Sequence, residues 1–202
     1  MYTFEEFLLW FALVFPLVFS AGPGNVLCAV CGATNGFKKS VPFILGLDLV
    51  YTIYSLLIGF GLFSLVINNP SVMTVIQVLG ILYIFWLAYK FFSRKSITKK
   101  EANPKLRFID GVISQALNIK GVTIVITMYS QFLNKDGNII YEVLTLSLAL
   151  LILNLFTHFT WVYGGAWMSQ KFASNYAVEI QSKIFGLMLI IVAFFLSYKI
   201  VL

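Results

Sequence analysis

The chain has 202 residues, of which 60% are hydrophobic and 11% are charged, and its formal net charge is +6 at pH 7. Soluble domains carry about a quarter charged residues, so this composition excludes a water-soluble globular protein and predicts a chain embedded in lipid. The apolar residues form unbroken runs and do not alternate, which excludes a transmembrane β-barrel. No Walker loop, nucleophile elbow or paired carboxylates occur, so we predict that the protein is not an enzyme.

Six spans are predicted from the stretches without charge, because an ionised side chain at the bilayer centre costs about 2.5–3.5 kcal/mol. Their ranges are 7–33, 41–67, 72–92, 109–133, 140–168 and 184–202. The turn signal Asn68-Asn69-Pro70 separates the second span from the third. The predicted fold class is therefore an all-α integral membrane protein with six transmembrane helices, which form a single transmembrane domain over residues 1–202.

Basic residues gather on one side of this predicted topology. They are Lys38, Lys39, Lys90, Arg94, Lys95, Lys99, Lys100, Lys105, Arg107, Lys171 and Lys183. The positive-inside rule places these loops in the cytoplasm and both termini outside. We interpret the segment 94–107 as a loop that faces lipid headgroups, in preference to a nucleic-acid-binding segment.

The first predicted span contains a helix-breaking sequence, Gly22-Pro23-Gly24-Asn25. Proline removes a helix hydrogen bond, and backbone groups freed at membrane depth persist only against protein or a watery cavity. A kink packed against neighbouring helices is the alternative. The apolar run has an acidic start and continues past residue 22, which favours a retained span over a cleaved signal peptide.

A second polar sequence, Asn118-Ile119-Lys120, interrupts the fourth predicted span. Lys120 lies about ten residues from the cytoplasmic start of this span, which is roughly 15 Å deep at 1.5 Å per residue. A lysine at that depth needs an anion, carbonyl groups or water, so it is a candidate binding residue. A side chain that reaches back to the headgroups is the alternative.

Two further ionisable residues lie inside predicted spans. Asp48 enters from the same cytoplasmic side as Lys120 and is the predicted counter-charge for it. His158 lies near the middle of the fifth span. We predict that both residues take part in proton coupling; a static ion pair for Asp48 and a packing role for His158 are the alternatives.

Cys28 and Cys31 have the C-x-x-C spacing of thiol–disulfide carriers. Because they follow the first break on an apolar helix rich in small residues, we favour a packing role. A membrane thiol–disulfide electron carrier remains one alternative function. A metal-ion exporter of the cadmium type, which would use the two thiols with Asp48 and His158, is another. No resident metal and no cofactor are predicted.

The two halves of the chain resemble each other in order: a broken helix, a middle helix and a helix that contains Gly80 or Gly186. We predict one repeat at about 1–93, a cytoplasmic linker at about 94–108 and a second repeat at about 109–202. With three spans each, the repeats are inverted, and the interrupted first and fourth helices indicate a binding site near the membrane midplane.

These motifs resemble the lysine exporter (LysE/RhtB) family of bacterial amino-acid exporters over nearly the whole chain. The matching positions are Gly22-Pro23-Gly24-Asn25, Gly32, Gly36, Lys38, Gly46, Gly61-Leu62, Gly80-Ile81-Leu82-Tyr83, Leu87-Ala88, Lys90, Asn118-Ile119-Lys120 and Gly186. Ile119 stands where the family has proline, which predicts a milder second break. Asp48 stands where a small or apolar residue is expected. The resemblance implies proton-driven export of amino acids or similar small solutes across the bacterial cytoplasmic membrane.

Together these observations predict a secondary transporter that works by proton antiport and alternating access. The predicted substrate-binding residues are Gly22, Pro23, Gly24, Asn25, Asn118 and Lys120, and the predicted proton-coupling residues are Asp48 and His158. The expected partners are a small-molecule substrate, protons and the lipid bilayer, without nucleic acid. A homodimer is left open.

Overall fold

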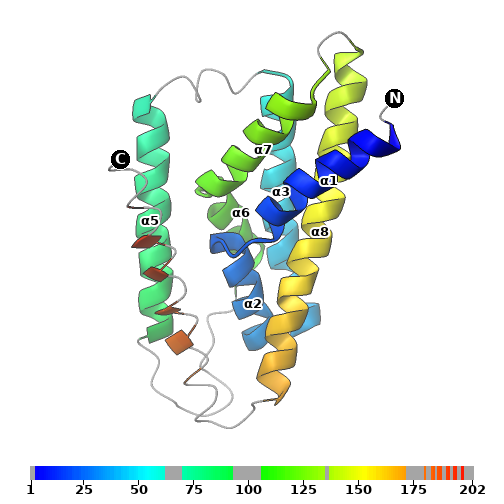
Figure 1. The fold of residues 1–202 in the computed structure, drawn as a ribbon. Helices are drawn as coiled ribbons and strands as arrows, with labels where there is room; N and C mark the ends of the chain where they lie inside the picture. Colours follow the sequence, from blue (N-terminus) through cyan, green and yellow to red (C-terminus); the bar gives the residue numbers. More distant parts are fainter. Residues whose placement is uncertain are drawn as a thin grey trace.

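The computed structural model describes residues 3–61, 70–92, 106–134 and 137–171, with individual helical positions between 180 and 197. The helices in these ranges are α1 (Phe4–Phe19), α2 (Pro23–Asn35), α3 (Phe37–Gly59), α5 (Pro70–Phe92), α6 (Phe108–Ala116), α7 (Ile119–Phe132) and α8 (Ile139–Lys171). Figure 1 shows α5 on one side of the molecule and α8 on the other, with α2, α3, α6 and α7 between them. The all-α prediction is confirmed for these residues.

The first predicted span is broken into α1 and α2. A capping box starts α1, because Thr3 Oγ1 accepts from Glu6 N at 3.2 Å and Glu6 Oε2 accepts from Thr3 N at 2.7 Å. α2 begins at Pro23, whose missing N–H and fixed φ suit the first position of a helix. The two helices are bent by 61° at this break.

The fourth predicted span is broken in the same way, into α6 and α7, with a bend of 63°. The expectation of a milder second break is therefore wrong. Asn118 explains the difference, since its side chain caps α7 by accepting from Gly121 N at 3.4 Å. An asparagine cap starts a new helix as effectively here as a proline at the first helical position does in α2.

The second predicted span, 41–67, has different boundaries in the structure. α3 begins earlier, at Phe37, because Gly36 has a φ of +76° and turns the chain directly out of α2. It ends at Gly59, where Gly61 has a φ of +73° and donates to Ile58 O at 3.0 Å. The predicted end at residue 67 is wrong for this helix, and residues 62–69 lie outside the described ranges.

The predicted spans 72–92 and 140–168 are confirmed as helices α5 and α8. α3 and the stretch Ile139–Gln170 are each long and apolar enough to cross a membrane, and each bent pair qualifies as a further span, within the described part of the chain. Most of the sixth predicted span and most of the linker at 94–108 lie outside that part, so the inverted six-helix arrangement stays a prediction.

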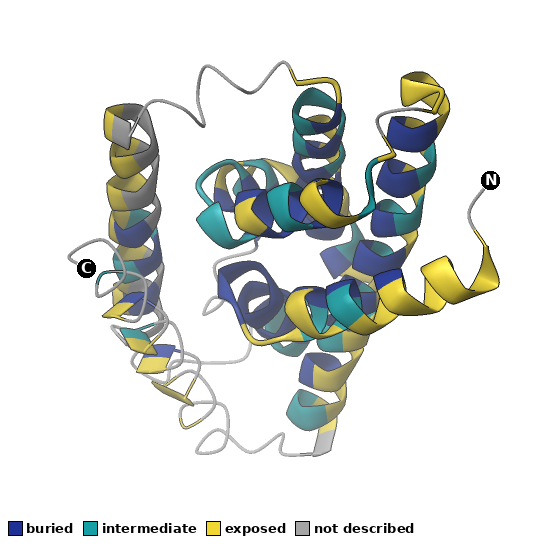
Figure 2. Cartoon of the chain, turned by 45° about the horizontal axis from the view of Figure 1, so that its top comes forward, coloured by how far each residue is buried: buried dark blue, intermediate teal, exposed yellow. Residues whose placement is uncertain are grey.

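The outer surface of these helices is apolar. Large side chains are exposed at intervals of about one helical turn, at Leu45, Leu49 and Ile53 on α3 and at Leu148, Ile152 and Phe156 on α8. Figure 2 shows exposed residues along the outward sides of the helices and buried residues toward the centre. An exposed apolar surface of this extent, on helices of this length, identifies a multi-pass membrane protein.

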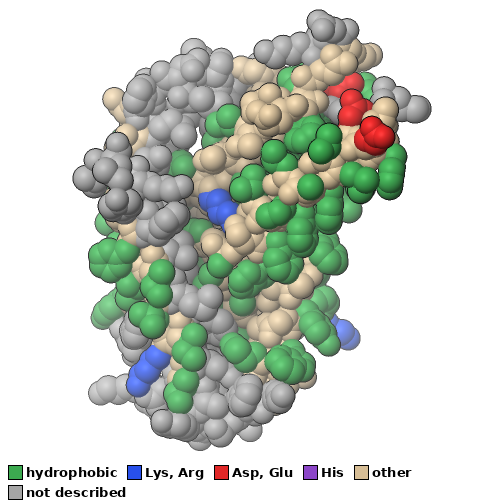
Figure 3. Space-filling view, viewed as in Figure 1, with side chains coloured by type: hydrophobic (Ala, Val, Ile, Leu, Met, Phe, Trp, Pro, Cys, Tyr) green, Lys and Arg blue, Asp and Glu red, His purple; other side chains and the backbone are tan. Residues whose placement is uncertain are grey.

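The two ends of the molecule differ in charge. We call the end with Lys38, Lys39 and Arg107 the basic end, and the end with Glu5 and Glu6, at the start of α1, the acidic end. Figure 3 shows acidic side chains gathered next to the N-terminus. The break between α1 and α2 lies between these ends.

Near the basic end, helices pack backbone against backbone. A β-carbon on any of four glycines would overlap the main chain of the opposite helix, in the pairs Gly32 with Val162, Gly165 with Ala29, Gly46 with Phe108 and Gly111 with Phe43. The first two pairs join α2 to α8, and the last two join α3 to α6. Small residues at such crossings allow helices in lipid to gain close van der Waals contact.

Toward the acidic end, α3, α7 and α8 meet through side chains. The hydroxyl group of Tyr129 on α7 lies 3.1 Å from Ser55 Oγ on α3 and 2.8 Å from Ser147 Oγ on α8. The two serine hydroxyls are 2.9 Å apart. This closed hydroxyl cluster is buried among apolar residues of α1, α7 and α8.

Candidate functional site

A pocket lies where the two helix breaks meet, between the basic and acidic ends. Its lining comes from α1, α3, α6 and α8 as well as from both breaks: Val18, Gly22, Gly24, Asn25, Tyr51, Gln115, Asn118, Lys120, Gly121, Ile124, Asn154 and His158. The centre of a water molecule can occupy about 20 Å³ of it, which is close to the minimum for one bound water. A larger guest requires the pocket to widen.

Side chains satisfy the carbonyl groups that the first break frees at the end of α1. Asn25 Nδ2 donates to Val18 O at 2.8 Å and to Ser20 O at 2.9 Å. Trp161 Nε1, from α8, donates to Phe19 O at 3.2 Å. These bonds hold the end of α1 against α2 and α8 and keep its polar backbone away from lipid.

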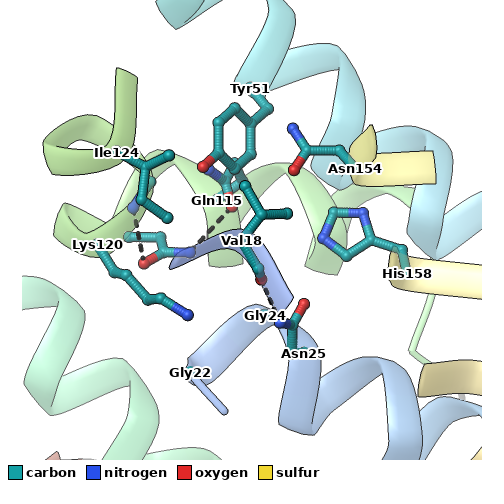
Figure 4. Close-up of a pocket in the computed structure, with 12 residues that line it drawn as sticks. Val18, Gly22, Gly24, Asn25, Tyr51, Gln115, Lys120, Ile124, Asn154 and His158 are labelled. Atoms are coloured by element: carbon teal, nitrogen blue, oxygen red, sulfur yellow. Dashed lines mark hydrogen bonds between the residues drawn. The ribbon is translucent and has the colours of Figure 1, made fainter. Parts of the chain in front are cut away.

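Lys120 reaches across from the second break to the first. Its Nζ donates to Ser20 O at 2.8 Å, so the ammonium group lies at the carbonyl end of α1. A β-carbon at Gly22 would lie 2.8 Å from Lys120 Cδ and 3.0 Å from its Nζ. The absence of a side chain at Gly22 thus leaves room for the lysine, as Figure 4 shows.

Two helix N-termini open at the pocket. α2 begins after Gly22, which provides no side-chain cap, and Gly24 and Asn25 in its first turn line the pocket. α7 begins after Asn118 with Lys120 in its first turn. The first amides of a helix lack acceptors within the helix, and its dipole is positive there. Two such ends beside an ammonium group are an arrangement that favours an anion.

Gln115 and Asn118 bridge the second break. Asn118 Nδ2 donates to Gln115 Oε1 at 3.0 Å, which fixes the orientation of the Gln115 amide. The Gln115 Nε2 then packs over Gly121, where a β-carbon would overlap it.

Three lining side chains carry buried polar atoms without a hydrogen-bond partner: Tyr51 OH, Gln115 Nε2 and Asn154 Oδ1. Tyr51 is 5% exposed, and the two amides are 1% exposed. A buried polar atom without a partner costs about 1–3 kcal/mol. Such atoms around one pocket indicate a polar guest.

Asp48 and His158 form a buried pair between α3 and α8. Asp48 Oδ1 lies 2.9 Å from His158 Nδ1, and the two side chains are 4% and 5% exposed. The prediction that Asp48 is the counter-charge of Lys120 is wrong, because the aspartate lies against His158 and Lys120 binds the carbonyl of Ser20. The imidazole lines the pocket, and the carboxylate lies behind it.

A family model described as "LysE type translocator" matches residues 15–200 of this chain. The chain belongs to the LysE family. The family resemblance predicted from the sequence motifs is therefore confirmed, and so is the prediction that the protein is not an enzyme.

Curated relatives of this LysE family member are efflux proteins. The chain is 28% identical to the cysteine/O-acetylserine efflux protein of Escherichia coli (strain K12), over 71% of this chain and 74% of that protein. It is 25% identical to the protein of the same name from Salmonella typhi, over 75% of this chain and 77% of the relative. No solved structure matches it.

The structure brings most of the predicted site residues of this LysE family chain to one pocket. Gly22, Gly24, Asn25, Asn118, Lys120 and His158 line it. Pro23 starts α2 next to the pocket without lining it, and Asp48 reaches it only through His158. Their roles in binding and coupling remain predictions.

Sequence reasoning did not include Tyr51, Gln115, Asn154 and Gly121 among the site residues. Gln115 and Gly121 flank the Asn118-Ile119-Lys120 sequence, so their position beside the second break was a usable signal. Asn154 lies one helical turn before His158 on α8, which was a second signal. Tyr51 gave none, because a tyrosine in an apolar helix is most often a packing residue.

Both cysteines on which the alternative functions depend lie within the described residues. Cys28 and Cys31 are both buried and free. Asn35 Nδ2 donates to Cys31 Sγ at 3.3 Å. Within the residues that the structure describes, no group of three His, Cys, Asp or Glu side chains could hold a metal ion.

Proposed function

We propose that this LysE family protein exports amino acids from the bacterial cytoplasm by proton antiport with alternating access. One observation carries the proposal: Lys120 and two helix N-termini, at the breaks of two bent spans, converge on a single pocket inside the membrane domain. A transporter for zwitterions needs such a site, because a carboxylate leaves water only where fixed donors replace its hydration.

The substrate carboxylate binds between the start of α2 and Lys120. The first-turn amides at Gly24 and Asn25 donate to it, and the ammonium group moves from Ser20 O to the carboxylate. Since Lys120 already lies beside Gly22, this exchange needs only a rotation of the lysine side chain. While Lys120 Nζ donates to Ser20 O, the carbonyl end of α1 balances the charge of the lysine.

The Asp48–His158 pair carries the coupled proton. When His158 is neutral, the pair has a net negative charge that attracts the substrate ammonium to the imidazole side of the pocket. A proton taken up by the pair cancels this charge and weakens ammonium binding. Substrate and proton therefore exclude each other, which is the requirement for antiport. The other ionisable groups near this pair are Cys28 on α2, Tyr51 on α3 and, across the pocket, Lys120 on α7.

The two ends of the molecule supply two different seals for alternating access. The backbone contacts of α2 with α8 and of α3 with α6 close the path to the basic end, which we assign to the cytoplasm. The hydroxyl cluster of Ser55, Tyr129 and Ser147 closes the path to the acidic end, which we assign to the outside. The pocket, in which Lys120 is partly exposed, lies between these two sets of contacts.

The relatives suggest which solutes to test first. Because the curated relatives are named for efflux of cysteine and O-acetylserine, these two amino acids are the first substrates to assay for this chain.

The experiment uses the purified full chain in proteoliposomes. Uptake of each labelled amino acid is measured with and without an imposed pH gradient, for the wild type, Lys120→Met and His158→Gln. Loss of a charge-assisted hydrogen bond costs about 1.5–3 kcal/mol, so Lys120→Met should slow transport by roughly 10- to 100-fold. His158→Gln should retain exchange of substrate for substrate and lose its acceleration by the pH gradient. Lys39→Met, at an exposed position of the basic end, is the matched control and should transport as the wild type does.

Unchanged transport by Lys120→Met would reject the binding site. A full response of His158→Gln to the pH gradient would reject the proton-coupling pair. Transport of neither amino acid by the wild type, in a panel that includes other amino acids, would reject the export function.

A further inference from the structure

Three polar side chains of the pocket have no role in the proposed carboxylate site or in the proposed proton-carrying pair. Tyr51, on α3, Gln115, at the end of α6, and Asn154, on α8, each hold a buried polar atom that makes no hydrogen bond. Figure 4 shows the three side chains lying on the side of the pocket away from Gly22 and the start of α2. They come from three different helices, so their meeting at one pocket is a property of the fold and not of one sequence segment.

The three side chains are uncharged, and together they offer both hydrogen-bond donors and acceptors. Gln115 offers a donor to the pocket, because its Nε2 has no partner while its Oε1 already accepts from Asn118 Nδ2 at 3.0 Å. The Tyr51 hydroxyl both donates and accepts, and the Asn154 amide has one donor group and one acceptor group whichever way it is turned. A ligand group that matches this set has a hydrogen-bond donor and an acceptor of its own and no charge.

The lining also defines what this part of the pocket excludes. Among the lining residues, the ionisable side chains other than tyrosine are Lys120 and His158, and no carboxylate faces the pocket directly. A second ammonium or guanidinium group on the substrate would therefore be buried without a counter-charge, at high cost. A purely apolar side chain would leave the three polar atoms unsatisfied.

We propose that Tyr51, Gln115 and Asn154 determine specificity, and that they select small neutral amino acids whose side chains form hydrogen bonds, such as those with a hydroxyl group. The inference rests on the proposed export function, since it assigns the side-chain end of the same site. Serine fits this set, alanine lacks the hydrogen-bonding group at nearly the same size, and lysine carries the excluded charge.

The test compares serine, alanine and lysine in the proteoliposome assay. Each variant removes one hydrogen-bonding group at nearly constant volume: Tyr51→Phe, Gln115→Met and Asn154→Leu. The matched control is Thr157→Val, which removes another buried hydroxyl without a partner on α8 at a residue that does not line the pocket.

The wild type should carry serine about tenfold faster than alanine at low concentration, because one buried hydrogen bond separates the two substrates. Lysine should not be carried. Each pocket variant should slow serine by about tenfold and change alanine by less than about twofold, so that the serine-to-alanine ratio falls toward one. Thr157→Val should keep the wild-type ratio. Retained alanine transport shows that each variant is folded.

Equal transport of serine and alanine by the wild type, transport of lysine at the serine rate, or an unchanged ratio in all three variants would overturn the inference. Lys120→Met, measured in the same vesicles, separates this failure from failure of the export function. If Lys120→Met blocks both solutes while the pocket variants leave the ratio unchanged, only the specificity assignment is wrong. If the wild type carries no amino acid, or if Lys120→Met transports normally, the proposed function itself is wrong.

Discussion

Asn25 shows how a single side chain keeps a broken helix intact inside lipid. The break leaves carbonyl groups at the end of α1 without helical partners, and Asn25 donates to two of them, Val18 O at 2.8 Å and Ser20 O at 2.9 Å. The side chain is 6% exposed, so water cannot take its place. Both bonds use the amide nitrogen, so the N–H donors of Asn25 matter more for stability than the size of its side chain.

We therefore expect Asn25→Asp to destabilise the protein, although aspartate has nearly the same shape. It removes both N–H donors and places a carboxyl group against two carbonyl oxygens. The expected loss is about 2 kcal/mol in the free energy of unfolding, measured as a lower midpoint of thermal unfolding in detergent. A midpoint equal to that of the wild type would contradict this role of Asn25.

Helix packing near the basic end depends on positions where no side chain fits. Gly165 of α8 lies against the main chain of Ala29 in α2, whereas the adjacent Gly164 has nothing within 4 Å of the position of a β-carbon. The two glycines therefore form a matched pair on one helix. Only one of them is required by a close approach of backbones.

Gly165→Ala should lower the free energy of unfolding by about 1–3 kcal/mol, because the added methyl group forces α2 and α8 apart. Gly164→Ala should unfold at the wild-type temperature or slightly above it, since alanine is the better helix former. Thermal unfolding of both variants in the same detergent checks the difference. Similar midpoints for the two variants would show that the backbone contact is unimportant.

The helix breaks can be predicted from the sequence because their signals are local. Proline between glycines and a polar sequence inside an apolar run each disturb the nearest helical turn, so both positions were visible without a structure. The predicted end of α3 is wrong because this helix ends at a glycine with positive φ, and the residue type alone does not reveal that conformation. The second break was expected to be mild because a cap by Asn118 was not considered in place of proline.

Contacts between distant helices were predicted less well. Asp48 was assigned to Lys120 because both enter the membrane from the same predicted side. Its contact with His158 depends on how α3 and α8 rotate about their axes, which the hydrophobic pattern leaves undefined, since both helices are apolar on most sides. For the same reason, the sequence does not predict that Tyr51 of α3 faces the pocket.

For the whole molecule, the difference in charge between the two ends has a consequence for orientation. Basic residues flank the helices at one end and acidic residues at the other, and the positive-inside rule predicts that the basic end lies in the cytoplasm. The same orientation is required if the proposed exporter takes its substrate from the cytoplasm through the glycine-packed half.

This orientation predicts how single cysteines react in intact cells. In a background with Cys28→Ala and Cys31→Ala, Glu5→Cys should react with a membrane-impermeant maleimide added outside. Lys39→Cys should react only after the cells are permeabilised. Both positions are exposed in the structure. The reverse labelling pattern would mean that the chain is inserted the other way.

The start of α2 affects how mutational data on this protein will be interpreted. Pro23 has no N–H group, and the donors that follow belong to the peptide backbone at Gly24 and Asn25. Exchanging side chains leaves those donors in place, so, for the proposed site, we expect a deep mutational scan to assign most of the anion affinity to Lys120 and little to this turn. Replacing the backbone amide of Gly24 or Asn25 by an ester would remove one N–H donor and measure its contribution to anion affinity directly.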